Sequence, residues 1–159
     1  MLISASSFSK VYEVIFSIAL LELSSHFLIP SWPVCFNLET FALSFILLKY
    51  GPLVLNSAAL SYLLVCFSFK FMGVSPTFGY LMGYCLYARF FNVFKSAFKF
   101  NNLFAIYFSN LAVCLFGTIF LSYYMNIALV SAFKLGFLPF LVGEAIKAFS
   151  ASYFFNKNK

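Results

Sequence analysis

The sequence predicts an all-α integral membrane protein built as a bundle of six transmembrane helices. Three observations predict this fold class. Hydrophobic residues make up 64% of the 159-residue chain and charged residues only 9%, whereas a soluble domain carries roughly a quarter charged residues. Runs such as 14–21 and 41–48 are nearly continuously apolar, so they lack the alternation of membrane β-barrel strands. Several runs also approach the roughly 20 residues that a spanning helix needs.

Three spans are predicted in the first half of the chain. The first runs from about 10 to 29 and ends at Pro30-Ser31-Trp32-Pro33. It is too long for a signal-peptide core and lacks a small-residue cleavage site, so we expect it to be retained. The second, from about 36 to 48, is short, so we expect it to be tilted or shielded by its neighbours. The third runs from about 53 to 69, after Gly51-Pro52.

Three more spans are predicted in the second half. The fourth runs from about 77 to 94, after a loop that contains Pro76, and a polar interruption follows it. The fifth runs from about 103 to 124. Residues 125–136 are ambiguous and fit a short helix lying near the interface. The sixth runs from about 138 to 155, and its second residue is a proline, which suits a first helical turn.

The whole chain, 1–159, is predicted to be a single membrane domain, because no repeat or linker interrupts it. The positive charges predict its orientation. A cytoplasmic N-terminus places most lysines between or beyond the spans on the inner side: Lys10, Lys49, Lys95, Lys99, Lys157 and Lys159. Only Lys70 and Lys134 then face outward, in agreement with the positive-inside tendency. Both termini are therefore expected to be cytoplasmic.

In this orientation, polar residues gather where the second, fourth and sixth helices begin at the outer face. The residues are Asn37, Glu39 and Thr40 on the second helix, Thr77 and Tyr80 on the fourth, and Glu144 and Lys147 on the sixth. The positive dipole ends of these three helices would point toward one region. Such helix ends often face an anionic substrate in transporters. The pattern predicts an outward-facing pocket for a small molecule with polar groups and a carboxylate.

Glu144 and Lys147 are the most informative pair. At spacing i,i+3 they share a helix face and can form an ion pair, and ionisable residues inside a membrane span usually face a cavity or a partner. The alternative is that they only neutralise each other. Arg89, inside the fourth helix, is the other ionisable residue whose place in a membrane span costs free energy. It either reaches the ligand or extends to the inner interface, and the sequence does not decide between these two roles.

Other functional classes find little support. The basic residues are scattered singly, which argues against nucleic-acid binding. There is no GxxxxGK[ST] phosphate loop and no Asp in the chain, so ATP hydrolysis by that route and a paired-carboxylate hydrolase are disfavoured. The four cysteines are far apart in the sequence and are best interpreted as small buried hydrophobes. We predict neither an enzyme nor a bound cofactor.

Three segments resemble the BioY-type biotin transporters. Pro33-Val34-Cys35-Phe36-Asn37-Leu38-Glu39-Thr40-Phe41-Ala42 resembles the family pattern PVPITLQTFA. Pro76-Thr77-Phe78-Gly79-Tyr80-Leu81-Met82-Gly83-Tyr84 is similar to PTGGYLLGF. Leu138-Pro139-Phe140-Leu141-Val142-Gly143-Glu144-Ala145-Ile146-Lys147-Ala148 resembles LPFLPGDLLKA. The three occur in the family's order, and with the helix count the resemblance covers most of the chain.

The resemblance implies a six-helix substrate-specific (S) component of an energy-coupling-factor (ECF) transporter in the bacterial cytoplasmic (inner) membrane. Such a subunit captures biotin from outside and works with a transmembrane coupling protein and two ATP-binding-cassette ATPases. The family's acidic residue and Lys of the last motif, which contribute to its biotin site, fall on Glu144 and Lys147. Its Thr and Tyr of the second motif fall on Thr77 and Tyr80. Glu144 replaces the usual Asp, Glu39 the usual Gln, and Phe78 the first Gly of the second motif.

The leading hypothesis is therefore biotin uptake, with Lys147 meeting the carboxylate or orienting Glu144. Asn37, Thr40 and Thr77 are candidates for the ureido ring. Two alternatives stay open: an S component for another vitamin, and a structural membrane protein that transports nothing.

Overall fold

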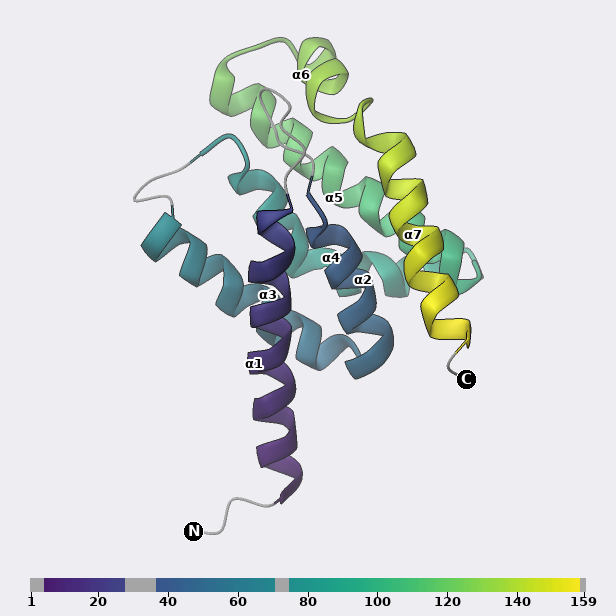
Figure 1. Cartoon of the computed structure of the whole chain (residues 1–159). Coiled ribbons are helices and arrows are strands. Elements are labelled where there is room, and N and C mark those ends of the chain that lie inside the picture. Colours follow the sequence, from purple (N-terminus) through teal and green to yellow (C-terminus); the bar gives the residue numbers. More distant parts are fainter. Residues whose placement is uncertain (1–4, 28–36, 71–74, 158–159) are drawn as a thin grey trace.

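The structure, a computed structural model, describes residues 5–27, 37–70 and 75–157. These residues form seven α-helices and one π-helix (Figure 1). In chain order they are α1 (Ala5–His26), α2 (Glu39–Tyr50), α3 (Pro52–Val65), the π-helix η1 (Cys66–Lys70), α4 (Phe78–Ser96), α5 (Asn102–Met125), α6 (Leu129–Gly136) and α7 (Phe140–Lys157). The prediction of an all-helical bundle is confirmed.

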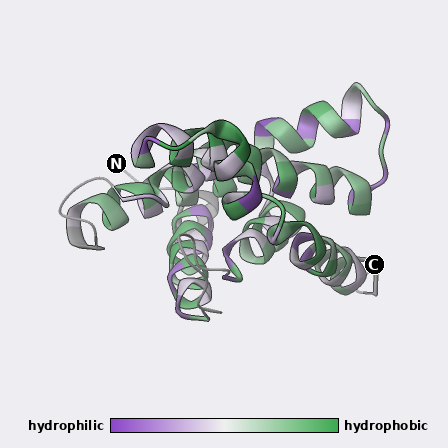
Figure 2. Cartoon of the chain, turned by 90° about the horizontal axis from the view of Figure 1, so that it is seen from above, coloured by the Kyte–Doolittle hydropathy of each residue, from purple (hydrophilic) through white to green (hydrophobic). Residues whose placement is uncertain are grey.

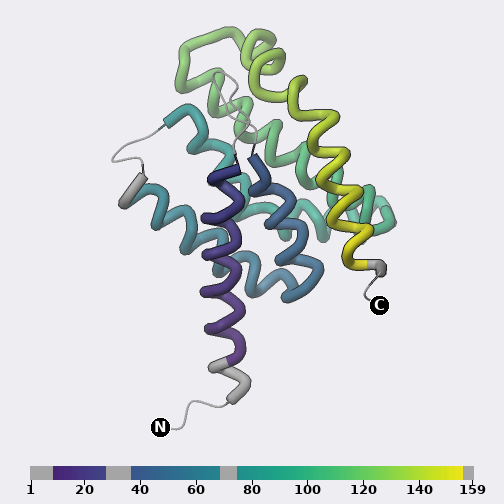
Figure 3. The backbone as a smooth tube through the Cα atoms, viewed as in Figure 1, coloured from purple at the N-terminus to yellow at the C-terminus, as the bar shows by residue number. Residues whose placement is uncertain are grey.

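The helices pack as a bundle that is held by contacts between helices consecutive in the sequence and by contacts between helices far apart in it. α4 and α5 form an extensive helical hairpin, α5 also contacts α6 and α7, and α1 packs on α3 and α2. α2 packs against α7, although nearly a hundred residues separate them in the sequence. In Figures 1 and 3 the N-terminal part of α1 extends past the other helices. The α2–α7 contact brings together the two segments that carry most of the predicted site.

Among its described residues, the bundle exposes many large apolar side chains and buries three charged ones, Glu39, Glu144 and Lys147. Leu53, Val130 and Val142 are 76%, 68% and 72% exposed, whereas the carboxylate residues Glu39 and Glu144 are 5% and 2% exposed. Coloured by hydropathy, much of the length of the helices is hydrophobic (Figure 2). A soluble protein rarely exposes contiguous apolar surface on this scale, whereas lipid tolerates it. The polarity of the bundle therefore agrees with a membrane environment.

The helices differ in how well they meet the requirements for a membrane span. Among the described residues, only α5 is both long and apolar enough to cross a membrane alone, and α6 with α7 qualifies as a pair bent by 45°. α2 has only 12 residues, and seven of them are buried, which confirms the expectation that it is short and shielded. The six predicted spans therefore correspond to helices of unequal length and hydropathy.

Most predicted boundaries lie within a few residues of the observed ones, and three details differ. α1 begins at Ala5 and ends at His26, earlier at both ends than predicted. The third span is broken, because α3 passes into η1 at Cys66. Pro139 lies in the turn before α7 rather than in its first turn. The ambiguous segment 125–136 contains α6, so the short helix suggested there is confirmed, whereas its position at an interface stays a prediction.

Local sequence explains the tight turns that orient the hairpin helices. Asn101 caps α5, since its side-chain oxygen accepts the backbone N–H of Phe104 at 3.0 Å, a bond that stabilises a helix start. Asn126 ends α5 in the left-handed conformation at φ 52°, which Asn adopts more readily than most residues. Gly51, at φ 86°, allows the chain to turn directly from α2 into α3.

A close helix approach positions Tyr80 on α4. A Cβ at Gly117 of α5 would lie 2.3 Å from Cγ of Tyr80, so only glycine leaves room for the ring. The Tyr80 hydroxyl then donates to the backbone carbonyl of Gly136 at 2.8 Å. A Cβ at Gly136 would in turn lie 2.6 Å from that hydroxyl. Two glycines therefore fix one tyrosine between α4, α5 and α6.

Gly117→Ala is expected to destabilise the bundle by about 1–3 kcal/mol, the usual cost of overpacking a core. Thermal unfolding of the detergent-purified protein measures the effect. Gly83→Ala is the matched control, because its Cβ would meet Val113 Cγ1 at the milder distance of 3.2 Å. Equal unfolding temperatures for the Gly117 variant and the unmodified protein would contradict the packing described here.

Candidate functional site

The centre of the site is a buried ion pair that joins α7 to α2. Lys147 Nζ lies 2.7 Å from Glu144 Oε1, and both residues are on α7. Thr40 of α2 donates its hydroxyl to Glu144 Oε2 at 2.7 Å and accepts from Lys147 Nζ at 3.0 Å. All three residues are at most 5% exposed. The predicted pairing of Glu144 with Lys147 is confirmed, and Thr40 completes the triad.

A second buried carboxylate, Glu39, lies at the start of α2. Tyr62 of α3 donates to its Oε1 at 2.5 Å and Tyr84 of α4 to its Oε2 at 2.8 Å. The Asn37 amide also donates to Oε2, while its side-chain oxygen accepts the Glu39 backbone N–H at 3.2 Å. Glu39 thus connects three helices through neutral donors.

The cluster carries unequal numbers of buried negative and positive groups. Among the described residues it contains two carboxylates, Glu39 and Glu144, and one ammonium group, Lys147. With all three ionised, its net charge is −1. Hydrogen bonds from hydroxyl and amide donors and the positive N-terminal end of α2 offset part of the cost of burying Glu39. The charge of a ligand should therefore matter strongly at this site.

A hydrogen-bonded chain leads from the triad into the bundle. Ser44, one turn after Thr40, lies 2.8 Å from the Tyr87 hydroxyl and 2.7 Å from the Thr40 carbonyl, and its single hydroxyl proton can be donated to either of them. Tyr87 of α4 donates to Asn110 Oδ1 of α5 at 2.7 Å. The Asn110 amide nitrogen is buried without a hydrogen-bond partner among the described residues. This chain couples the position of α2 to α4 and α5.

Tyr87→Phe is expected to lower the stability of the bundle by about 1–3 kcal/mol, because it leaves the buried Asn110 oxygen without its donor. The unfolding temperature of the purified protein reports this loss. The control is Tyr107→Phe, since Tyr107 is only partly buried and outside the chain. Equal unfolding temperatures in the two variants would show that the hydrogen-bonded chain contributes nothing.

The predicted site residues do not all converge. Thr40, Glu144 and Lys147 form one hydrogen-bonded group, Asn37 and Glu39 belong to another, and the two groups adjoin where Glu39 and Thr40 follow one another on α2. Tyr80 is buried but donates to the Gly136 carbonyl, and the Thr77 hydroxyl lies 2.9 Å from that of Ser75.

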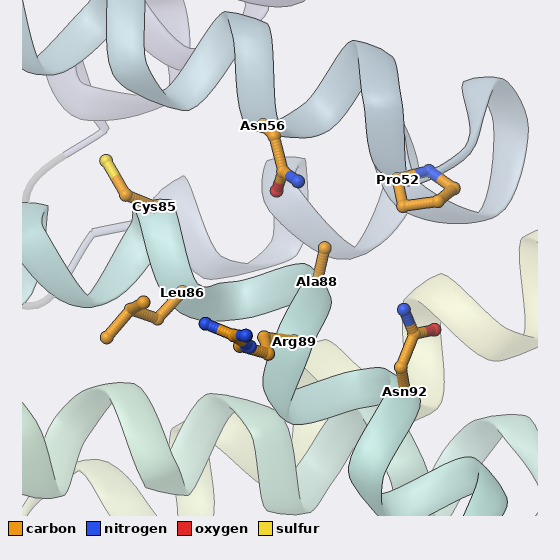
Figure 4. Close-up of a pocket in the computed structure, with 7 residues that line it drawn as sticks. All are labelled: Pro52, Asn56, Cys85, Leu86, Ala88, Arg89 and Asn92. Atoms are coloured by element: carbon orange, nitrogen blue, oxygen red, sulfur yellow. The ribbon is translucent and has the colours of Figure 1, made fainter.

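Arg89 lies elsewhere, in a groove between α3 and α4 (Figure 4). The structure gives Thr77, Tyr80 and Arg89 no hydrogen bond to the two carboxylates, so their contact with a ligand stays a prediction.

Sequence reasoning missed several residues that hold the cluster: Ser44, Tyr62, Tyr84, Tyr87 and Asn110. A signal for part of this set was present. Tyr80, Tyr84 and Tyr87 follow an i, i+4, i+7 spacing and therefore share one face of α4. In a chain with 10 Tyr and 25 Phe, aromatic residues are first attributed to interfacial belts. With so many aromatic residues, the spacing of these three tyrosines did not stand out.

The arrangement is suited to binding rather than to bond-breaking chemistry. It places an ammonium group, two carboxylates and several hydroxyls in a buried region, where polar groups orient a small molecule. No group of His, Cys, Asp or Glu that could hold a metal ion occurs in the described part of the chain. The site therefore offers hydrogen bonds and charge, supplied by α2, α3, α4 and α7.

Comparison with known proteins gives two findings. The model of the BioY family matches residues 3–158, nearly the whole chain. A crystal structure of the S-component for biotin from an ECF-type ABC transporter superposes with a TM-score of 0.73 at 20% sequence identity. That match covers 99% of this chain and 94% of the other. No curated protein sequence gave a match.

Proposed function

Because the chain belongs to the BioY family, we propose that it captures biotin as the S component of an ECF-type transporter. Its fold is that of a biotin S component along 99% of its length, and the family is one of multi-pass membrane proteins without enzymatic activity. The ligand is proposed from the family and from the chemistry of the site together.

The observation that carries the proposal is the position of the buried Lys147. Its ammonium group is held by Glu144 Oε1 at 2.7 Å and by Thr40 Oγ1 at 3.0 Å. Burial of an ion pair with one further hydroxyl contributes little to stability by comparison with apolar packing. The presence of this charged pair inside the bundle is better explained by a ligand with a carboxylate and hydrogen-bonding groups.

Within this proposal, Lys147 binds the biotin carboxylate or orients Glu144. The polar groups that contact the ureido ring are those of Asn37, Thr40 and Thr77. Glu39 and Tyr80 complete the set of candidate ligand contacts, whereas Arg89, the remaining candidate from the sequence, lies in the separate groove between α3 and α4. The wider system is proposed to include a transmembrane coupling protein and two ATP-binding-cassette ATPases. The chain would lie in the bacterial cytoplasmic membrane with both termini inside.

Equilibrium binding of labelled biotin to the detergent-purified protein tests the proposal, with riboflavin and thiamine as competitors. Saturable binding that only unlabelled biotin displaces is the expected result. Absence of biotin binding by folded protein would overturn the proposal that biotin is the ligand. Glu39, in place of the family's Gln, favours one second candidate: an S component for a vitamin without a net negative charge. A broader vitamin screen would identify it.

A further inference from the structure

A second polar site lies between α3 and α4 and shares no residue with the carboxylate cluster. It is a groove of about 260 Å³ lined by Pro52, Asn56, Cys85, Leu86, Ala88, Arg89 and Asn92. In Figure 4 the Asn56 amide projects from α3 toward α4, which supplies Arg89 and Asn92. Cys85, Arg89 and Asn92 follow an i, i+4, i+7 spacing and so lie on one face of α4.

The arginine and asparagine side chains of this groove have no partners within the described part of the chain. Neither the Arg89 guanidinium nor the side-chain amides of Asn56 and Asn92 make a hydrogen bond or ion pair there, and all three residues are exposed. Arg89 lies seven residues before Ser96, the end of α4, which is roughly 10 Å along the helix axis. A guanidinium at that depth in a membrane protein needs an anionic or polar partner.

The groove is electropositive. None of its lining residues is acidic. The first turn of α3, which begins at Pro52, contributes the positive end of a helix dipole. A guanidinium with two neighbouring amides matches a phosphate group, because it can donate two parallel hydrogen bonds to the phosphate oxygens.

The surroundings favour a lipid over a soluble anion. Leu86 and Ala88 form apolar walls of the groove, and Leu53, beside Pro52, is 76% exposed. Leu60 and Leu64 extend this exposed apolar surface along α3. A phosphate group bound at Arg89 would therefore have acyl chains lying on a surface already suited to lipid.

We propose that this groove binds the headgroup phosphate of an anionic phospholipid, with Arg89 as the main contact and Asn56 and Asn92 as additional donors. In the predicted orientation, the start of α3 and the end of α4 face the cytoplasmic leaflet. Anionic lipid is enriched there, and basic pockets between membrane helices bind such headgroups.

Native mass spectrometry of the full chain, released from detergent in the presence of phosphatidylglycerol or phosphatidylcholine, tests the proposal. The unmodified protein should retain phosphatidylglycerol in preference to phosphatidylcholine. Arg89→Gln should reduce phosphatidylglycerol retention about fivefold, because glutamine cannot donate two parallel charge-assisted hydrogen bonds to the phosphate. Arg89→Lys should give an intermediate loss, because an ammonium group cannot bind phosphate in the same bidentate way.

Lys99→Gln is the matched control, since it removes one exposed positive charge from the turn after α4. It should change retention less than twofold. The unfolding temperature in phosphatidylcholine shows that the variants are folded.

Equal phosphatidylglycerol retention by the unmodified protein and the Arg89→Gln variant would overturn the proposal. Displacement of the lipid by millimolar inorganic phosphate would instead indicate a soluble-anion site and would also overturn it. Loss of biotin binding in Arg89→Gln with unchanged lipid retention would assign Arg89 to the vitamin site.

Discussion

Lys147→Met is expected to abolish saturable biotin binding and to destabilise the protein by about 3–5 kcal/mol. Lys147 is 5% exposed, and its ammonium group is hydrogen-bonded to Glu144 and Thr40. Its removal leaves the Glu144 carboxylate buried with only the Thr40 hydroxyl as a donor in the triad. The loss of one partner from a buried ion pair carries this cost because the other charge stays uncompensated. Biotin binding and thermal unfolding in detergent measure the two effects.

The double variant Glu144→Met with Lys147→Met separates function from folding. Replacing both partners with apolar side chains of similar volume is often neutral for stability. The double variant should therefore unfold at a temperature much closer to that of the unmodified protein than Lys147→Met does. Biotin binding should stay absent. Full binding by the double variant would instead show that the pair merely neutralises itself and does not contact the ligand, and it would remove the main argument for a ligand site at Lys147.

Continuous apolar runs made the helices of this chain predictable, because a span in lipid is recognised from length and hydropathy alone. The boundaries of α4 and α5 therefore lie within two residues of prediction. The break between α3 and η1 was not predictable, since residues 62–67, which surround it, are continuously apolar. The change from α- to π-type hydrogen bonding at Cys66 left no signal in composition.

The charged half of the site was predictable because charge in a membrane span is rare. Glu144 and Lys147 stood out for that reason, and their i,i+3 spacing predicted the contact. The partners of Glu39 were not predictable to the same extent. Whether Tyr62 faces lipid or the interior depends on the rotation of α3, which packing against α1, α2 and α4 determines. A helix that is apolar all around gives no amphipathic pattern from which to read that rotation.

Glu39→Gln is expected to tighten biotin binding about tenfold. The fold should survive, because a Gln oxygen can accept from one tyrosine while its amide donates to the other, so that Tyr62 and Tyr84 both keep a partner. The substitution changes the net charge of the ionised cluster from −1 to zero. A nearby like charge at an effective dielectric constant of about 20 opposes an anionic ligand by on the order of 1–2 kcal/mol, or about tenfold in affinity.

Comparison of biotin with its uncharged methyl ester distinguishes this electrostatic effect from a direct contact. If Glu39 acts by repulsion, the gain in affinity appears with biotin and is absent with the ester. Glu13→Gln, which removes a carboxylate from α1 outside the cluster, should alter neither affinity. Weaker binding of both ligands by Glu39→Gln would contradict repulsion, because it is the result expected when the carboxylate accepts an N–H of the ureido ring. The sign of the change therefore determines whether the Glu at position 39 opposes the ligand's carboxylate or binds its opposite end.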